Sequence, residues 1–410
     1  MLLPRRPVIL FGVCFTLILI LTARSLSRPW HEVPQVIGLG DLVHASSSTT
    51  ELWNTTRVHT DADLFAPPPN FFPGTPKPPG YKYSKVVVVT RTKEENTDWI
   101  ARELHDWDRA IYVADDPNAP LHPPKNKGHE VMIYLTYIID HYDKLPDVAV
   151  FMHSHQFAWH NDVLFGGDAA QLLRSLNLNR VIREGYMNTR CGFGPGCPAW
   201  IHPGAVEGDE SKQEEVMLAR AWGELFPDQQ IPSVLSQPCC AQFALSRERI
   251  RSIPRARFVY YRDWLLSTEL SDYITGRIWE YLWQYIFTGQ AVLCPDEHVC
   301  LCDGYGFCFD GADGWQAYRE AESQKDELQR ELDNWLWMSD EMVLADLEDE
   351  SNETGKPALS EEEKTDDIIN RLQEKEREVF SRLSGALERG QNPQYRALEA
   401  GRPWKEGDGF

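Results

Sequence analysis

The sequence predicts an α/β protein built on a mostly parallel β-sheet with helices on its faces. Two features of residues 83–310 predict this class. Short apolar runs alternate with longer segments whose apolar residues recur at helical spacing, and this alternation is typical of an α/β domain. Each apolar run also ends in polar residues, which places candidate binding groups at the carboxyl ends of the predicted strands.

The first predicted strand is "KVVVVTR", where a β-branched run from Val86 to Val89 is bounded by polar residues. Such a run suits a strand that is buried on both faces, as in a parallel sheet. "NTDWIARELHDW" follows with helical spacing, and "RAIYVADD" predicts a second short strand. "NKGHEVMIYLTYIIDHYDKLP" has a wide apolar helical face, and "DVAVFMHSH" predicts the third strand.

A second block, residues 181–308, carries most of the cysteines. There "CCAQFALSRERI" predicts a strand and then a helix that begins near Ser246, a residue suited to capping. "GRIWEYLWQYIF" predicts one buried helix, because its apolar residues fall on one face. Those residues are Ile278, Tyr281, Leu282, Tyr285 and Ile286.

The N-terminal segment predicts a membrane anchor and a stem. Residues 8–23 form an apolar run that is shorter than the ~20 residues of a plasma-membrane span. The run suits a signal anchor in the thinner membranes of the early secretory pathway, or a cleaved signal peptide, in which case the protein is secreted. Arg5 and Arg6 keep residues 1–7 cytosolic, which predicts a single-pass type II protein of the Golgi or ER membrane. Residues 24–82, rich in Pro, Ser and Thr, are expected to form the stem.

Cysteine usage agrees with a luminal domain. Of the nine cysteines, Cys14 lies in the apolar run, and the others form an even set that predicts disulfides in an oxidising compartment. Zinc binding is the alternative, but the spacings fit Cys-x2–4-Cys pairs poorly, and the pairing is not deducible from the sequence. Asn54 and Asn352 stand in glycosylation sequons. The predicted disulfide cysteines are Cys191, Cys197, Cys239, Cys240, Cys294, Cys300, Cys302 and Cys308.

The formal net charge of -21 argues against a nucleic-acid partner, because phosphates require a basic face. Much of the negative charge lies in residues 311–410, which read as an acidic, helical and partly disordered tail. One narrow apolar stripe in this tail is enough to dock on a protein partner or on the domain, and too little for an independent fold. The stripe consists of Ile368, Leu372, Val379, Leu383 and Leu387.

Polar residues at the strand ends predict a ligand site, because the carboxyl ends of parallel strands meet at one edge of a sheet. Thr90 and Arg91 follow the first strand, and the Arg91 side chain either binds a phosphate or lies on the surface. Asp115 and Asp116 follow the second strand, where an Asp-Asp-Pro turn is the plainer explanation.

Histidines follow the third strand and raise the possibility of a metal site. His153 and His155 alternate along the strand, so both point to one face. With His160 or Asp162 they could complete a three-ligand site. The alternative is a set of hydrogen-bonded loop residues at a strand end.

The segment before the second predicted helix also suits an anionic ligand. Lys125, Asn126, Gly128 and Glu130 lie where the helix begins. A helix N-terminus, a lysine side chain and a glycine that allows close approach all suit a diphosphate. Glu130 is equally explained as the acidic residue that helix N-termini favour.

Four stretches carry a resemblance to a known family: "VVVVTRTKEENTDWIARELHDWDRAIYVADD", "NKGHEVMIYLTYIIDHYDKLPDVAVFMHSH", "QPCCAQFALSRERI" and "GRIWEYLWQYIF". Over roughly residues 83–308 the chain resembles a fungal family known as domain of unknown function 3431, whose members are similar to GT-A type glycosyltransferases. The resemblance implies a GT-A-like, Rossmann-type domain. It would bind a nucleotide sugar and transfer the sugar to a glycan or protein acceptor.

The resemblance also implies roles for individual residues. Asp115 and Asp116 would contact a uracil or ribose. An inverting transferase needs a carboxylate base, for which Glu280 is the first candidate and Asp263 the second, with Asp272 behind them. The alternative for Glu280 is a buried bond to a neighbouring arginine or to the backbone.

One departure from the GT-A pattern concerns the metal. GT-A enzymes usually hold Mg²⁺ or Mn²⁺ with an Asp-x-Asp motif, and here His153-Ser154-His155 stands in that place. Two alternatives follow: transfer without a metal, or transfer with a Mn²⁺-like ion bound by the histidines. Two other functions are also open: a metal-dependent hydrolase using His153, His155 and His160, and a non-catalytic luminal binding protein whose helical tail recruits a partner.

Overall fold

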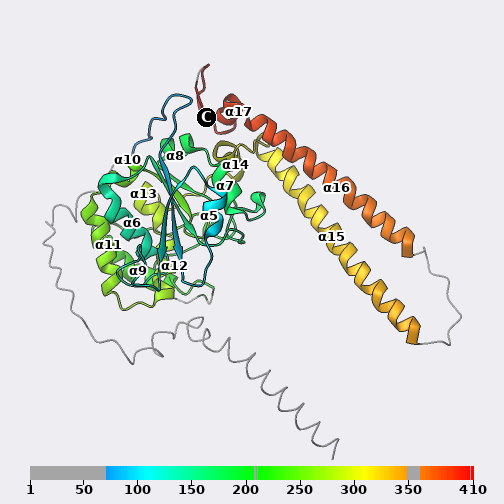
Figure 1. The fold of residues 1–410 in the computed structure, drawn as a ribbon, viewed down its shortest axis with the longest axis horizontal. Coiled ribbons are helices and arrows are strands. Elements are labelled where there is room, and N and C mark those ends of the chain that lie inside the picture. Colours follow the sequence, from blue (N-terminus) through cyan, green and yellow to red (C-terminus); the bar gives the residue numbers. More distant parts are fainter. Residues whose placement is uncertain (1–70, 207–208, 210, 349–360, 407) are drawn as a thin grey trace, which may run out of the picture.

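In the computed structural model of the 410-residue chain, residues 71–348 and 361–410 are described, except 207–208, 210 and 407. Figure 1 shows an α/β domain from which two long helices extend to one side. No helix in the described ranges is long and apolar enough to cross a membrane. The predicted anchor at 8–23, the stem up to residue 70 and both sequons, Asn54 and Asn352, lie outside the described residues.

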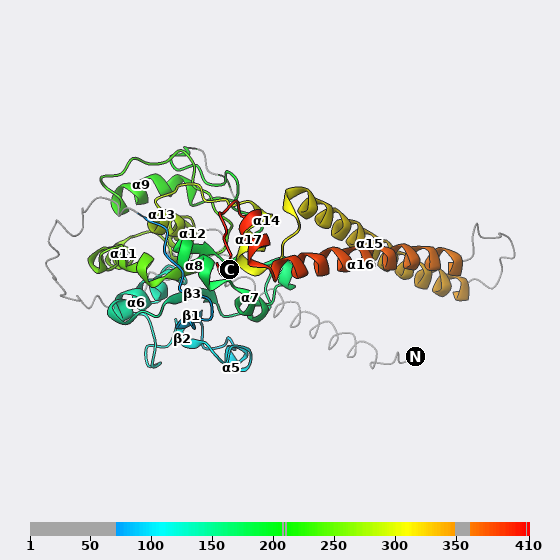
Figure 2. The same cartoon turned by 90° about the horizontal axis from the view of Figure 1, so that it is seen from above.

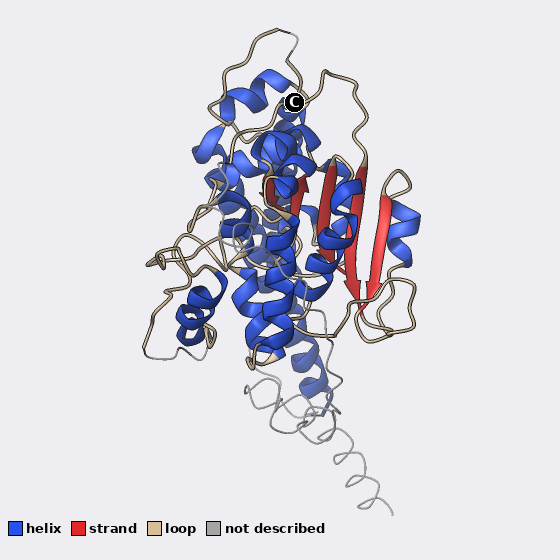
Figure 3. Cartoon of the chain, turned by 90° about the vertical axis from the view of Figure 1, so that its left-hand side faces the viewer, coloured by secondary structure: helices blue, strands red, loops and turns tan. Residues whose placement is uncertain are grey.

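Five strands form one mixed sheet in the order β2-β1-β3-β5-β4 (Figure 3). Strands β1, β2 and β3 are parallel, which confirms the α/β class and the three predicted strands. Strand β5 runs antiparallel to both β3 and β4, a reversal that the sequence did not predict. The strands are β1 (Lys85–Arg91), β2 (Asp108–Val113), β3 (Val148–His153), β4 (Tyr186–Asn188) and β5 (Phe243–Ser246).

Helices cover both faces of the sheet, and each face has its own apolar core. Val86 and Val88 of β1 point into the first core, with helices α6, α9, α11, α12 and α13. Val87 and Val89 point into the second, with α5, α7, α8 and α14. All four valines are buried, as the predicted two-sided burial requires, and each contributes roughly 1.5–3 kcal/mol. These helices are α5 (Asp98–Glu103), α6 (Val131–His141), α7 (Ala169–Ser175), α8 (Leu178–Glu184), α9 (Glu215–Leu225), α11 (Arg255–Ser267), α12 (Asp272–Glu280), α13 (Trp283–Thr288) and α14 (Glu297–Tyr305).

Two local predictions can be compared with the helices. The helix after β5 is α10 (Arg247–Arg251), and the Ser246 side chain accepts a hydrogen bond from the Arg249 N–H, so the predicted cap is confirmed. The single helix predicted from "GRIWEYLWQYIF" is wrong, because the chain forms α12 and α13 with a break at Tyr281 and Leu282. At the break the backbone makes i→i+3 hydrogen bonds, a tight turn that leaves the apolar pattern uninterrupted.

The chain after the domain forms the two-helix arm, made of α15 (Gly311–Glu348) and α16 (Glu361–Gly390), followed by α17 (Pro393–Glu399). Figures 1 and 2 show α15 and α16 side by side along the length of the arm. Ile368 and Leu372 of the predicted stripe are buried, and Val379 and Leu383 pack on the second core, while Leu387 is about 38% exposed. The stripe therefore docks on α15 and on the domain.

Four disulfides join all eight cysteines that were predicted to form them. Two bridges close long loops and tie the region after β4 to the start of α14. The other two are local, one of them between adjacent residues. The pairs are Cys191–Cys300, Cys197–Cys294, Cys239–Cys240 and Cys302–Cys308.

Candidate functional site

The order of the parallel strands creates a switch point at their carboxyl ends. From β1 the chain crosses to β2 on one side, and from β2 it returns to β3 on the other side of β1. Ligands of open α/β sheets bind in the crevice at such a point. Here the crevice lies between the ends of β1 and β3, where Thr90 and His153 are partners in the ladder. The Thr90 hydroxyl is buried without a hydrogen-bond partner in the described chain.

The antiparallel β5 brings a further group to the same edge. Its amino end lies beside the carboxyl half of β3, where Phe243 pairs with Phe151. The loop that leads into β5 contains the Cys239–Cys240 disulfide. Cys240 and Ala241 adopt positive φ angles of 93° and 50°, a conformation that non-glycine residues rarely take and that marks functional loops.

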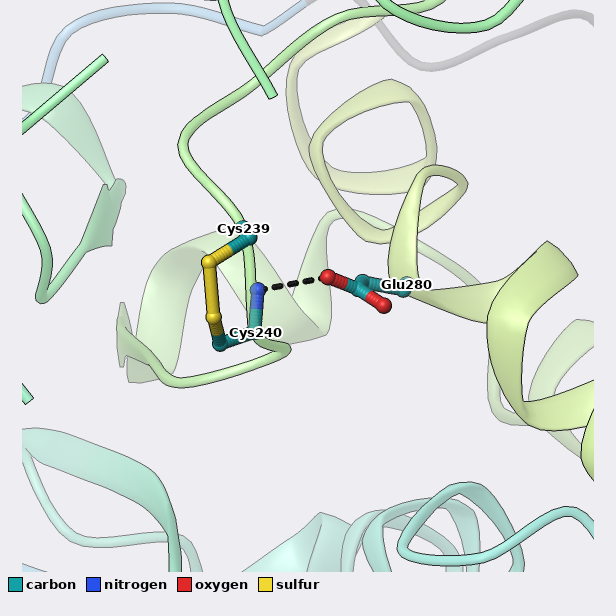
Figure 4. A group of neighbouring side chains, drawn as sticks. All are labelled: Cys239, Cys240 and Glu280. Carbon is teal, nitrogen blue, oxygen red and sulfur yellow. Dashed lines mark hydrogen bonds between the residues drawn. A yellow bond between two sulfur atoms is a disulfide. The ribbon is translucent and has the colours of Figure 1, made fainter. Parts of the chain in front are cut away.

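Glu280, at the end of α12, points at this disulfide loop (Figure 4). Its Oε1 atom accepts a hydrogen bond of 2.7 Å from the backbone N–H of Cys240. Arg277, one turn earlier, instead pairs with Glu214 at 2.8 Å. Of the alternatives for Glu280, the structure therefore shows the bond to the backbone and not the one to arginine.

The environment of Glu280 makes it a base suited to neutral pH. Burial raises the pKa of its carboxyl to about 7. The N–H of Cys240 and the charge of Arg277 lower this pKa, while the nearby carboxylates of Glu130 and Glu214 raise it. A carboxylate with a pKa near 7 can accept a proton in a reaction and lose it again to solvent.

His153 and His160 lie beside this group. The Nε2 atom of His153 is 2.8 Å from the carbonyl oxygen of Cys240, so Nε2 carries the hydrogen and donates it. The rings of His153 and His160 are 4.7 Å apart. Burial, together with the charges of His153, His155 and Arg190, lowers the pKa of His160 to about 4, so its ring is neutral at physiological pH. Its buried Nε2 has no partner among the described residues.

Gln242, whose place beside the cysteine pair suggested that it lines the acceptor cleft, organises the histidine loop. Its Oε1 accepts the N–H of His153 at 3.1 Å, and its Nε2 donates to Oδ1 of Asn161 at 3.0 Å. Only its position two residues after the cysteine pair, at the start of a strand, could have indicated this role.

Asp162 anchors the same loop. Its two carboxylate oxygens accept the N–H groups of Leu164 at 3.0 Å and Cys191 at 2.8 Å. Burial raises the pKa of this carboxyl. Both oxygens are thus engaged with the backbone, as in the alternative explanation of a hydrogen-bonded loop.

Among the described residues, the predicted histidine set does not have the spacing of a metal site. Nε2 of His153 donates to a carbonyl, and Nε2 of His155 lies 3.5 Å from a carboxylate oxygen of Glu95. Within the described chain, two groups of three donor residues have the spacing of a metal site, and neither contains a histidine. Both rely on cysteines that are joined in disulfides, whose sulfurs are not thiolate ligands.

The predicted donor-binding residues lie around the same edge, several of them in local bonds. The Nη1 group of Arg91 donates to the carbonyl oxygen of Glu95. Asp115 accepts the N–H of Lys93 at 2.9 Å, and Asp116 pairs with the Lys93 ammonium at 3.6 Å. The two aspartates therefore tie the end of β2 to the loop after β1, and Lys93 lies beside them as a cation that was not predicted.

The segment before α6 is held by α12. The N–H of Gly128 donates to Asp272, so the carboxylate of Asp272 occupies this helix N-terminus. Glu130 takes the N-cap position and is buried, close enough to influence Glu280. Lys125 and Asn126 are exposed in the preceding loop.

The second candidate base, Asp263, does not join this group. It lies exposed on α11 and lines a surface groove with Glu224 and Trp264. None of the residues that surround Glu280 lines that groove.

Comparison with known proteins identifies a family but no individual relative. A family model described as "Protein of unknown function (DUF3431)" matches residues 87–303, more than half of the chain. The match covers the sheet except for the first two residues of β1, and it covers every residue of the Glu280 group. No curated protein matches, and no solved structure matches.

Proposed function

This chain belongs to the DUF3431 family of proteins of unknown function, and from its own residues we propose that it is a GT-A-like glycosyltransferase. The proposed reaction moves a sugar from a nucleotide sugar to a hydroxyl of a glycan or protein acceptor. The observation that carries the proposal is Glu280: a carboxylate with a pKa of about 7 beside the carboxyl ends of the parallel strands.

Glu280 is the proposed general base. The acceptor hydroxyl loses its proton to the Glu280 carboxylate while its oxygen attacks the anomeric carbon, and the nucleoside diphosphate leaves. The Cys240 N–H that binds Oε1 keeps the carboxylate oriented towards the loop. A base that takes the proton on the face opposite to the leaving group gives inversion at the anomeric carbon.

The nucleotide sugar is proposed to lie in the crevice between β1 and β3. The unpartnered hydroxyl of Thr90 and the side chain of Arg91 are at that point, and Lys93 follows. These groups favour a phosphate-bearing donor. Since the described histidines do not have the spacing of a metal site, the proposed transfer needs no divalent ion, and the cationic side chains offset the charge of the diphosphate.

The proposed location is the lumen of the ER or Golgi, with residues 8–23 as the signal anchor. Four disulfides in the described chain support an oxidising compartment. The two-helix arm is the proposed docking element for a protein partner, since it carries exposed apolar side chains near its far end, among them Trp337.

The test combines a donor screen with a matched pair of variants. The purified full-length protein is screened against nucleotide sugars by thermal shift, with and without Mn²⁺, and transfer is then assayed with the donor that stabilises it. Glu280→Gln is expected to keep donor binding and to lose roughly 10²–10⁴-fold in turnover. The same change at Glu103, on the surface of α5, serves as the control and should leave turnover unchanged. If no nucleotide sugar binds at millimolar concentration, the proposal is wrong and a non-catalytic binding protein becomes the better explanation.

A further inference from the structure

Four arginines line a cavity of about 250 Å³ beside the edge strand β4. Residues of β4 form one wall, and the loop that ends at Pro295 forms another. Glu280 and the residues that contact it do not line this cavity. The arginines are Arg180 and Arg183 of α8, Arg190 after β4, and Arg249 of α10.

Within the described chain, only two of these four arginines form a salt bridge, and both do so with the same carboxylate. Glu184 is the one acidic residue in the lining of the described cavity, and its side chain is exposed. Asp303 lies behind the wall and is shared, 2.8 Å from Arg183 and 3.8 Å from Arg180. The same carboxylate also pairs with Arg402 at 2.9 Å. One carboxylate therefore serves three guanidinium groups.

The other two arginines form no salt bridge within the described residues. Arg190 donates through its Nη atoms to the carbonyl oxygens of Trp159 at 3.0 Å and Gly194 at 2.8 Å. Arg249 likewise donates to carbonyl oxygens, including that of Phe287 at 2.8 Å. Asp162 and Glu297 lie close enough to Arg190, and Glu184 to Arg249, to raise the pKa of these arginines, but none forms a salt bridge with them in the described chain.

Two guanidinium nitrogens in the cavity wall have no partner. The Nε atoms of Arg183 and Arg190 are buried and form no hydrogen bond in the described structure. Arg190 is only 8% exposed, so water is largely excluded from it. Burial also lowers the pKa of Arg180, Arg190 and Arg249, which reflects the cost of removing a cation from water.

We propose that this cavity is a binding site for a small anion that presents a phosphate or carboxylate group. The planar guanidinium group matches the geometry of both anions. A bound anion would accept hydrogen bonds from the Nε atoms of Arg183 and Arg190, which otherwise have no partner in the described chain. The volume is below the roughly 300–1,000 Å³ of pockets for drug-sized ligands, which favours a small ion over a nucleotide sugar. The site is distinct from the Glu280 group and does not depend on the proposed transferase activity.

Calorimetry on the full-length protein tests the site with inorganic phosphate, sulfate, acetate and citrate, at constant ionic strength in chloride. The expected result is saturable binding of one anion per chain. Stronger binding of phosphate and sulfate identifies a phosphate-type ligand, and stronger binding of citrate identifies a carboxylate. Absence of saturable binding for all four anions up to about 10 mM overturns the proposal.

Variants at the rim separate this site from others without disturbing any guanidinium contact. Gln290 lines the mouth of the cavity and is exposed. Gln290→Glu should weaken the anion by about tenfold or more through charge repulsion, and Gln290→Lys should strengthen it. Equal affinity in both variants would place the anion elsewhere and overturn the proposal.

Arg190→Lys tests the guanidinium itself, because lysine keeps the charge but lacks the fork, and it should also weaken binding. Arg174→Lys is the matched control on α7, where the arginine pairs with Glu103 outside the cavity. If Arg190→Lys does not fold, the Gln290 pair still decides the question. Glu280→Gln should not change anion affinity, whereas a loss there would move the anion to the Glu280 group and contradict this site.

Discussion

The surroundings of Glu280 raise the pKa of its carboxyl from the acidic range into the neutral range. The usual pKa of 4.5 rises to about 7, with burial as the largest cause. The same residue type on the surface of α5, at Glu103, lies in an exposed ion pair. Residue type therefore identifies a possible base, and position on the fold determines at which pH it can act as one.

The change in unfolding free energy caused by Glu280→Gln is expected to be more favourable at pH 8 than at pH 5. A carboxyl with a raised folded-state pKa favours the folded state below about pH 4.5, and that contribution is lost as the pH rises through about 7. Glutamine does not ionise and avoids the loss. Urea unfolding between about pH 5 and pH 8 should show the difference in unfolding free energy growing by about 1–3 kcal/mol. A difference that is constant with pH would contradict the raised pKa.

For single residues, the sequence could predict which of them lie at the ends of the parallel strands. Thr90, His153 and their neighbours follow apolar runs, so periodicity alone places them at one edge of the sheet. The hydrogen-bond partners of Gln242 and Arg190 could not be predicted in the same way. Their roles arise from contacts across long stretches of chain, such as the hydrogen bond of Gln242 to the backbone of His153, and no local pattern encodes those contacts.

Among the elements, those with a long and regular apolar pattern could be predicted. The helix α6 and the strands β1 and β3 are buried along most of their length, so nearly every residue follows the period. Strand β4 has three residues, too few to show a period. The break between α12 and α13 leaves the apolar face continuous, so it has no signature in the pattern.

The base of the two-helix arm depends on two glycines in contact. A Cβ atom added at Gly390 would lie 1.8 Å from the carbonyl oxygen of Gly306, too close for either backbone to accept. Gly390→Ala should therefore destabilise the junction by about 1–3 kcal/mol. The matched control is Gly385→Ala in the same helix, where the nearest atom is the end of a flexible arginine side chain at 3.4 Å.

The control should be neutral or stabilising by about 0.5–1 kcal/mol, because alanine favours a helix over glycine. Chemical unfolding of the two variants measures the contrast, and limited proteolysis near residue 390 checks that the loss is at the junction. Equal stabilities for the two variants would show that the close contact between Gly306 and Gly390 does not constrain the arm.

For the whole molecule, the disulfides connect segments that are not paired with one another in the sheet. Cys197–Cys294 spans 97 residues and Cys302–Cys308 spans 6. In the chain-entropy account, a bridge that closes a loop of that larger size stabilises by about 4.7 kcal/mol, and one that closes the short loop by roughly half as much. Pairwise replacement by alanine should reproduce this order in urea unfolding under non-reducing conditions. A larger cost for the short bridge would show that local strain or packing, and not loop closure, determines the stability.

The overall architecture was predictable only in part, because strand order and pairing depend on long-range contacts. Alternating strands and helices predict the class and the parallel half of the sheet. The antiparallel direction of β5 cannot be predicted from its four residues, because the composition of a strand does not depend on its direction. The disulfide pairing follows from the same three-dimensional arrangement, which is why the number of cysteines predicted the bridges but not their partners.

The two-helix arm leaves the domain and returns to the same place. The N–H of Cys308 donates to the carbonyl oxygen of Ala386, so the chain before α15 and the end of α16 meet side by side. Helix α15, with 38 residues at 1.5 Å each, extends for about 57 Å from this meeting point. Because both helices are anchored at the same place, adding or removing matched turns in α15 and α16 would change the length of the arm and leave its anchorage unchanged. The geometry therefore separates the reach of the arm from the domain that carries it.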